Sequence, residues 1–149
     1  MKFLNIIFGI LTLILISCSP EPRPIEYGKD LCEHCQMVVA ENKWGAELVN
    51  DKGKLYFFDS IECLIAYLDK KDVKDNLKVF SSWTVNYQNP GELIDCSKAF
   101  YLYSPQLHSP MGLNVASFKT EEDRNNYLSF QDAKKLDYQA VVEKVKTEW

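Results

Sequence analysis

One short stretch of the chain concentrates side chains that bind soft metal ions. Cys32, His34, Cys35 and Met37 place two thiols, an imidazole and a thioether within six residues. Soft thiolate and thioether ligands select Cu(I), whereas two thiols with an imidazole would also satisfy zinc, so the sulfur of Met37 matters to the choice. The stretch therefore indicates a metal site, and Cu(I) is the ion that its donors fit best.

The cysteines of this stretch also allow other functions. Outside the cytoplasm thiols tend to oxidise, so Cys32 could be a further ligand, a disulfide partner of Cys35, or neither. A thiol-disulfide oxidoreductase that uses Cys32 and Cys35 is one alternative, and it predicts a helix that starts at the pair. A zinc-stabilised interaction module that uses this pair and two of Cys63, Cys96 and His108 is the other, and it predicts unfolding by a chelator.

The residues that follow the stretch are expected to be extended. Val38-Val39-Ala40 is a short apolar run, which is typical of a strand. In an extended chain Cys35 and Met37 share a face, and His34 points away from Cys35. Cys35 and Met37 are therefore the stronger candidate ligands, and His34 is a weaker one.

Three further candidates lie outside the stretch. Cys63 falls on an expected helix, where a cysteine is more often a small buried apolar residue than a ligand. Met111 lies in a proline-flanked loop and is followed by glycine, which favours a ligand over a core gap-filler. His108 precedes Met111 by three residues, so it reaches a metal only if this loop approaches the cysteine stretch.

The elements that must position these residues fall into two similar halves. Phe57-Phe58-Asp59-Ser60 and Ser117-Phe118-Lys119-Thr120 each lead into a capped helix, and they are offset by 60 residues. We therefore predict an α+β fold in which two ββαβ-type repeat units form one domain. The expected strands are 44–49, 55–58, 78–80, 83–87, 99–103 and 114–118, and the expected helices are 61–70, 121–130 and a last amphipathic helix within 132–149.

The first 17 residues are typical of a secretory signal peptide. Met1-Lys2 precedes a short apolar run that ends near Ile16, too short for a comfortable membrane span. Leu15-Ile16-Ser17-Cys18 also resembles the bacterial lipobox, which implies that Cys18 is lipidated and anchors the chain to a membrane from the extracytoplasmic side. Simple cleavage near Ser17 and an uncleaved anchor are the alternatives.

Composition divides the remainder into a tether and a domain. Residues 18–27 contain three prolines and little to bury, so we expect an extended, lipid-anchored tether after the signal peptide at 1–17. Residues 28–149 are enough for one domain with a real core. The formal net charge of −4 and the lack of a basic face argue against nucleic acid as a partner.

Several motifs together resemble the NosL family, the membrane-anchored copper chaperones linked to assembly of nitrous oxide reductase. The matching segments are DLCEHCQM (30–37), GAEL (45–48), YFFDSIECL (56–64), WTVNY (83–87), IDCSKAFY (94–101) and SPMG (109–112). The resemblance implies a fold of two ββαβ units and Cu(I) bound by Cys35, Met37 and Met111. Three positions depart from the family pattern without touching these ligands, since Gln36, Asn86 and Cys96 stand where glycine, aspartate and alanine are usual.

The resemblance also implies a function. The chain would deliver copper to a metalloenzyme, with assembly of the copper centre of nitrous oxide reductase as the expected role. Its partners would be the membrane, through the lipid anchor, an accessory ABC-transporter complex and the reductase. No residue is predicted to be catalytic, because the chain has neither a cysteine, histidine and acid constellation at a recognised spacing nor a glycine-rich phosphate loop. The sequence therefore predicts an extracytoplasmic binding protein rather than an enzyme.

Overall fold

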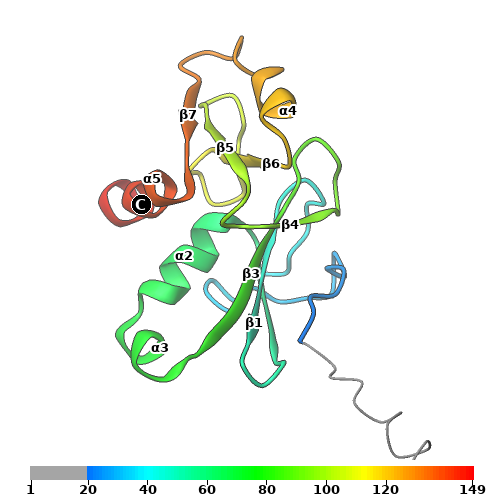
Figure 1. Cartoon of the computed structure of the whole chain (residues 1–149), viewed down its shortest axis with the longest axis vertical. Coiled ribbons are helices and arrows are strands. Elements are labelled where there is room, and N and C mark those ends of the chain that lie inside the picture. The colour runs from blue at the N-terminus through cyan, green and yellow to red at the C-terminus, as the bar shows by residue number, and fades with distance from the viewer. Residues whose placement is uncertain (1–19) are drawn as a thin grey trace, which may run out of the picture.

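A computed structural model describes residues 20–149 (Figure 1). The predicted signal peptide at 1–17 and the predicted lipidation of Cys18 lie outside this range. Within it, no helix combines the length and the apolar character that crossing a membrane requires. The predicted division into signal peptide, tether and domain therefore stays a prediction.

The first unit is an antiparallel sheet with two helices against it (Figure 1). Its elements are β1 (Ala46–Asn50), β2 (Leu55–Phe58), α2 (Ile61–Asp69), α3 (Lys71–Asn76), β3 (Val79–Val85) and β4 (Leu93–Asp95). The strand order is β2-β1-β3-β4, so β1 lies between its hairpin partner and the strand that returns after the helices. Only two residues separate the end of β2 from the start of α2.

The second unit repeats this arrangement. Its elements are β5 (Phe100–Tyr103), β6 (Val115–Phe118), α4 (Glu121–Asn125) and β7 (Lys134–Leu136), and α5 (Tyr138–Glu148) follows. The strand order β6-β5-β7 corresponds to β2-β1-β3 in the first unit. β2 ends at Phe58 and β6 ends at Phe118. These two positions differ by 60 residues, the offset seen in the sequence. The predicted α+β fold of two ββαβ-type units is confirmed.

Some expected elements differ from the observed ones. The residues around 38–40 form no regular strand and contribute only an isolated bridge between Leu31 and Val38. The strands expected at 78–80 and 83–87 are one continuous strand, β3. The helix expected over 121–130 is the short α4, and β7 replaces the start of the last expected helix. That helix begins only after Asp137, whose side chain accepts a hydrogen bond from the backbone N–H of Ala140 at 2.8 Å.

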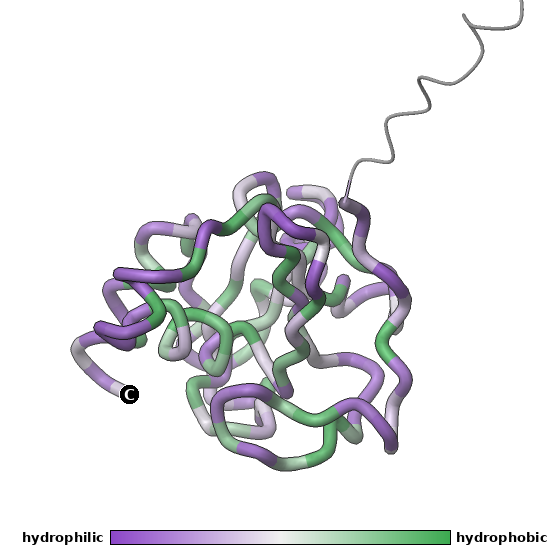
Figure 2. Tube along the Cα trace, turned by 90° about the horizontal axis from the view of Figure 1, so that it is seen from below, coloured by the Kyte–Doolittle hydropathy of each residue, from purple (hydrophilic) through white to green (hydrophobic). Residues whose placement is uncertain are grey.

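One hydrophobic core joins the two units. Buried Phe58 and Leu64 of the first unit belong to the same cluster as Tyr101 and Val115 of the second, and Val141 of α5 completes it. Green hydrophobic stretches run through the middle of the molecule in Figure 2, and many turns at its edges are purple. Because each unit buries apolar residues against the other, the units form a single folded body.

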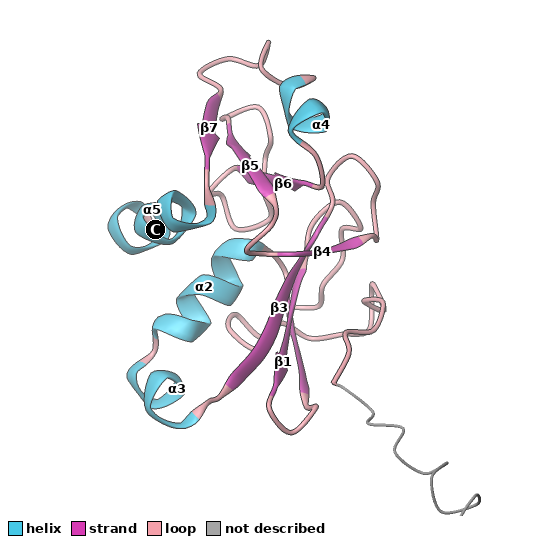
Figure 3. Cartoon of the chain, in the orientation of Figure 1, coloured by secondary structure: helices cyan, strands magenta, loops and turns pink. Residues whose placement is uncertain are grey.

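Residues 20–45 are drawn as loop in Figure 3, yet part of the predicted tether is bound to the domain. Ile25 is buried, and the Arg23 guanidinium lies 4.1 Å from the Phe57 ring centroid and 2.6 Å from Asp30. The backbone N–H of Arg23 donates to Glu47 Oε1 at 3.1 Å. The residues from Arg23 to Asp30 therefore form a strap that packs on the first sheet. Any free tether would have to lie before Arg23.

Glu47 under this strap should make stability depend on pH. Its side chain is fully buried, Oε2 has no hydrogen-bond partner, and burial raises the pKa from 4.5 to about 7. The folded state therefore binds this proton more tightly than the unfolded state, so the free energy of unfolding falls as pH rises from about 4.5 to about 7. Glu47→Gln should remove this dependence, because it removes the titrating group. The contribution that Glu47 makes to the change in the free energy of unfolding is roughly 3 kcal/mol at most.

Urea unfolding of the wild type and of Glu47→Gln at several pH values across this window measures the effect. The difference between the two proteins isolates Glu47, because burial also raises the pKa of Asp59 and of Glu62 and both remain in the variant. Parallel stability curves would contradict the assignment.

Candidate metal centre

The cysteine stretch folds into a closed loop instead of a strand. The Cys32 N–H donates to the Met37 carbonyl at 2.8 Å, and the Gln36 N–H donates to the Cys32 carbonyl at 2.9 Å. Gln36 has φ 64°, a left-handed conformation that glycine adopts more easily. The alternation of faces predicted for an extended chain therefore does not apply to Cys35 and Met37.

Hydrogen bonds to β2 attach this loop to the first sheet. Cys32 forms a parallel bridge with Phe57, and the Glu33 N–H donates to the Phe57 carbonyl at 2.9 Å. Ser60 occupies the N-cap position of α2, as predicted, although its side chain makes no capping hydrogen bond. Since only Asp59 and Ser60 separate the end of β2 from the start of α2, the loop and the first turn of this helix are brought to the same place.

Three sulfur atoms converge there. Cys32 and Cys35 come from the loop, Cys63 comes from α2, and their Sγ atoms all lie within 4.8 Å of one another. Cys32 and Cys63 are 0% exposed, whereas Cys35 is partly exposed. Three thiols at this separation could close on one soft metal ion. Cys63 is buried, as the sequence predicted, but its place in this cluster was missed because only the tertiary structure brings α2 to the loop.

The three thiols have different electrostatic states. The pKa of Cys32 is lowered, first because the Cys63 thiol lies beside its sulfur and also because backbone N–H groups, including that of Cys35 at 3.5 Å, point to it. The same proximity raises the pKa of Cys63, and burial raises that of Cys35. Cys32 is therefore the thiol of the cluster that loses its proton most easily.

The two methionines predicted as ligands lie in different surroundings. Met37 is 47% exposed, so its thioether is at the surface beside the loop. Met111 is partly buried against the main core, and its carbonyl accepts a hydrogen bond from Trp149 Nε1 at 2.8 Å. The Trp149 ring lies 5.7 Å from the His34 ring. Trp149 therefore contacts both the Met111 loop and the cysteine loop, and the role of Met111 as a ligand stays a prediction.

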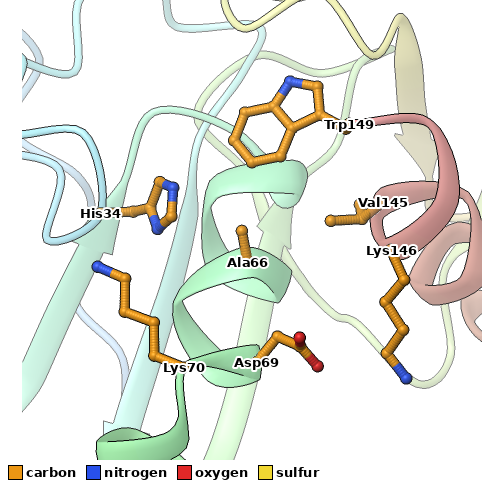
Figure 4. Close-up of a pocket in the computed structure, with 7 residues that line it drawn as sticks. All are labelled: His34, Ala66, Asp69, Lys70, Val145, Lys146 and Trp149. Carbon is orange, nitrogen blue, oxygen red and sulfur yellow. The ribbon is translucent and has the colours of Figure 1, made fainter.

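Neither histidine joins the three sulfurs. His34 lines a cavity of about 400 Å³ between α2 and the end of α5, and Figure 4 shows its imidazole beside the Trp149 ring and the Lys70 ammonium. Its Nδ1 is buried without a hydrogen-bond partner, and burial lowers the pKa of the imidazole. His108 is exposed in its loop and has φ 48°.

The fourth cysteine of the described region, Cys96, is separate from the cluster. It is 1% exposed in the main core, and burial raises the pKa of its thiol to about 12. All four cysteines from residue 20 onward are free thiols. Cys96 is therefore a matched reference for substitutions of the cluster cysteines.

The fold and site define an α+β protein of two repeat units with a three-thiol cluster between a loop and a helix. The model of the NosL family matches residues 24–145, so the chain belongs to the NosL family. Among solved structures, the crystal structure of the copper chaperone NosL from Shewanella denitrificans has the same fold. The TM-score is 0.67 over 81% of this chain and 95% of that one, at 17% sequence identity. No curated protein matches the sequence.

The different exposure of the thiols should appear in their reactivity. We expect iodoacetamide to modify Cys35 well before Cys32, Cys63 or Cys96 in the folded, metal-free protein, because these three are buried. Peptide mass spectrometry after short labelling times identifies the modified residue. Labelling in urea provides the control, since unfolding should make the four thiols react alike. Early modification of Cys63 would contradict the observed packing.

Proposed function

We propose that this chain is an extracytoplasmic, membrane-anchored Cu(I)-binding protein that delivers copper to a metalloenzyme, in the assembly of the copper centre of nitrous oxide reductase. The observation that carries the proposal is the cluster of Cys32, Cys35 and Cys63 sulfurs within 4.8 Å of one another. Membership of the NosL family and the copper chaperone named for the Shewanella structure support copper as the cargo.

The donor set favours Cu(I) over zinc. Structural zinc sites almost always have four ligands, whereas the cluster offers three thiols, and neither Cys96 nor His108 belongs to it. Cu(I) is well satisfied by two or three soft sulfurs. The thioethers of Met37 and Met111 are further soft donors, and with Cys35 they would hold copper in a form that a partner can take.

The arrangement is less suited to thiol-disulfide exchange. An exchanging protein needs a reactive, accessible thiolate, but here the thiol with the lowered pKa is the fully buried Cys32. The accessible Cys35 has a raised pKa. The pair also lies in a turn and not at the start of a helix. These observations favour metal binding over catalysis.

Copper binding by the full chain in detergent tests the proposal. We expect the reduced protein to bind one Cu(I) that survives moderate competition by bathocuproine disulfonate. Cys35→Ser should weaken binding by about 100-fold or more, because loss of a ligand costs more than the 10–100-fold typical of its supporting residues. Cys96→Ser should bind as the wild type does, and far-UV circular dichroism should show both variants folded.

Other results would favour the alternatives. Wild-type affinity in Cys35→Ser would contradict the site. Reduction of insulin by Cys32 and Cys35 without any effect of copper would indicate an oxidoreductase. Unfolding by a zinc chelator would indicate a zinc-stabilised module.

The proposed anchor and delivery role require a test in cells. In a bacterium whose nitrous oxide reductase depends on this chain, Cys18→Ser should move the protein from the membrane fraction to the soluble extracytoplasmic fraction, because the thiol that would carry the lipid is absent. Copper in the purified reductase should fall. The accessory ABC-transporter complex and the reductase are the proposed partners, so both should co-purify less with this variant than with Cys96→Ser. Unchanged membrane retention would contradict lipidation at Cys18.

A further inference from the structure

An ion held by all three cysteines would be difficult to pass on. Cys32 and Cys63 are 0% exposed, so a ligand from a partner cannot reach the metal from their side. Within the described part of the chain, Cys35 is the member of the cluster that solvent reaches. Exchange of a tightly bound ion is fastest when the new ligand binds before the old ones leave. The transfer step therefore has to take place at Cys35.

A second soft donor belongs to the same loop as Cys35. Met37 follows it by two residues and is 47% exposed. The hydrogen bonds that close the loop hold the Met37 backbone beside Cys32, with the Cys32 nitrogen 2.8 Å from the Met37 carbonyl oxygen. The loop therefore carries a buried thiol at Cys32, a partly exposed thiol at Cys35 and a thioether on an exposed residue, Met37.

We propose that Cu(I) occupies two positions that share Cys35. In the inner position the sulfurs of Cys32, Cys35 and Cys63 bind the ion. In the outer position the thioether of Met37 takes the place of Cys32 and Cys63, and the ion is open to a partner. This inference rests on the proposed function and adds which donors hold the cargo and which transfer it.

The exchange balances without any redox partner. When the ion moves outward, its bonds to Cys32 and Cys63 break, a bond to Met37 forms and the bond to Cys35 remains. Copper stays Cu(I), because no electron is transferred. The two thiolates that the ion leaves take up protons from solvent, which restores the free thiols found without metal.

Two substitutions in the full chain separate the positions. Cys63→Ser should lower the equilibrium affinity for Cu(I) by about 100-fold, because it removes an inner ligand. Met37→Leu should change the affinity by no more than about threefold, because the inner position is intact, but it should slow copper removal by bathocuproine disulfonate about tenfold. Cys96→Ser is the control for the buried change. Val38→Leu, at an exposed neighbour in the same loop, is the control for the surface change.

The outcomes distinguish this inference from the function on which it rests. X-ray absorption at the copper edge of the loaded wild type should count three sulfur ligands, and two would overturn the inner position even if Cys63→Ser failed to fold. Unchanged affinity in Cys63→Ser would also overturn it. Equal losses of affinity in Met37→Leu and Cys63→Ser would indicate one mixed site and overturn the second position. Failure of the wild type to bind Cu(I) would instead overturn the proposed function.

Discussion

The attachment of the cysteine loop to β2 is the constraint on which the site depends. The bridge between Cys32 and Phe57 fixes the loop beside the strand, and only two residues separate the end of that strand from the start of α2. Two parts of the chain about 30 residues apart in sequence therefore meet through a single strand. Neither the loop nor the helix alone brings three thiols together, so the three-thiol cluster depends on the β2 junction.

The second unit helps to hold α2 at this junction. Its strands share a core with α2, and α5 packs against the same helix. Trp149, at the end of α5, contacts both His34 and the carbonyl of Met111. The loop, the helix and the second unit are thus held in one arrangement. A metal ion at the cysteines would bind to a surface largely formed in advance, which limits the ordering cost of binding.

Burial gives chemically similar sulfurs different roles. Cys32 and Cys63 are shielded from water and lie beside each other, whereas Cys35 and Met37 meet solvent. Backbone N–H groups that point at the Cys32 sulfur favour its thiolate form, which an apolar core would otherwise disfavour. A soft metal could therefore be retained by the buried sulfurs and exchanged at the exposed ones.

Local sequence patterns were enough to predict most of the strands and helices, although not α3, β4 or β7. Apolar and aromatic runs predicted β2, β5 and β6, the helix at Ile61–Asp69 followed from apolar spacing, and the 60-residue offset predicted two related units. It also located the cysteine stretch, because the donor types are visible without a fold. These features depend on local periodicity and chemistry, which a sequence displays directly.

The assembly of the site depends on contacts between distant parts of the chain. The left-handed residue Gln36 turns an expected strand into a closed loop, because hydrogen bonds within the loop and to β2 outweigh the strand preference of Val38-Val39-Ala40. Cys63 reads as an ordinary core residue until α2 is placed beside that loop. Which thiols are buried, in which direction their pKa values shift and which one solvent reaches are all set by non-local packing. The spacing of residues in the sequence does not predict these properties, because the groups that determine them come from distant parts of the chain.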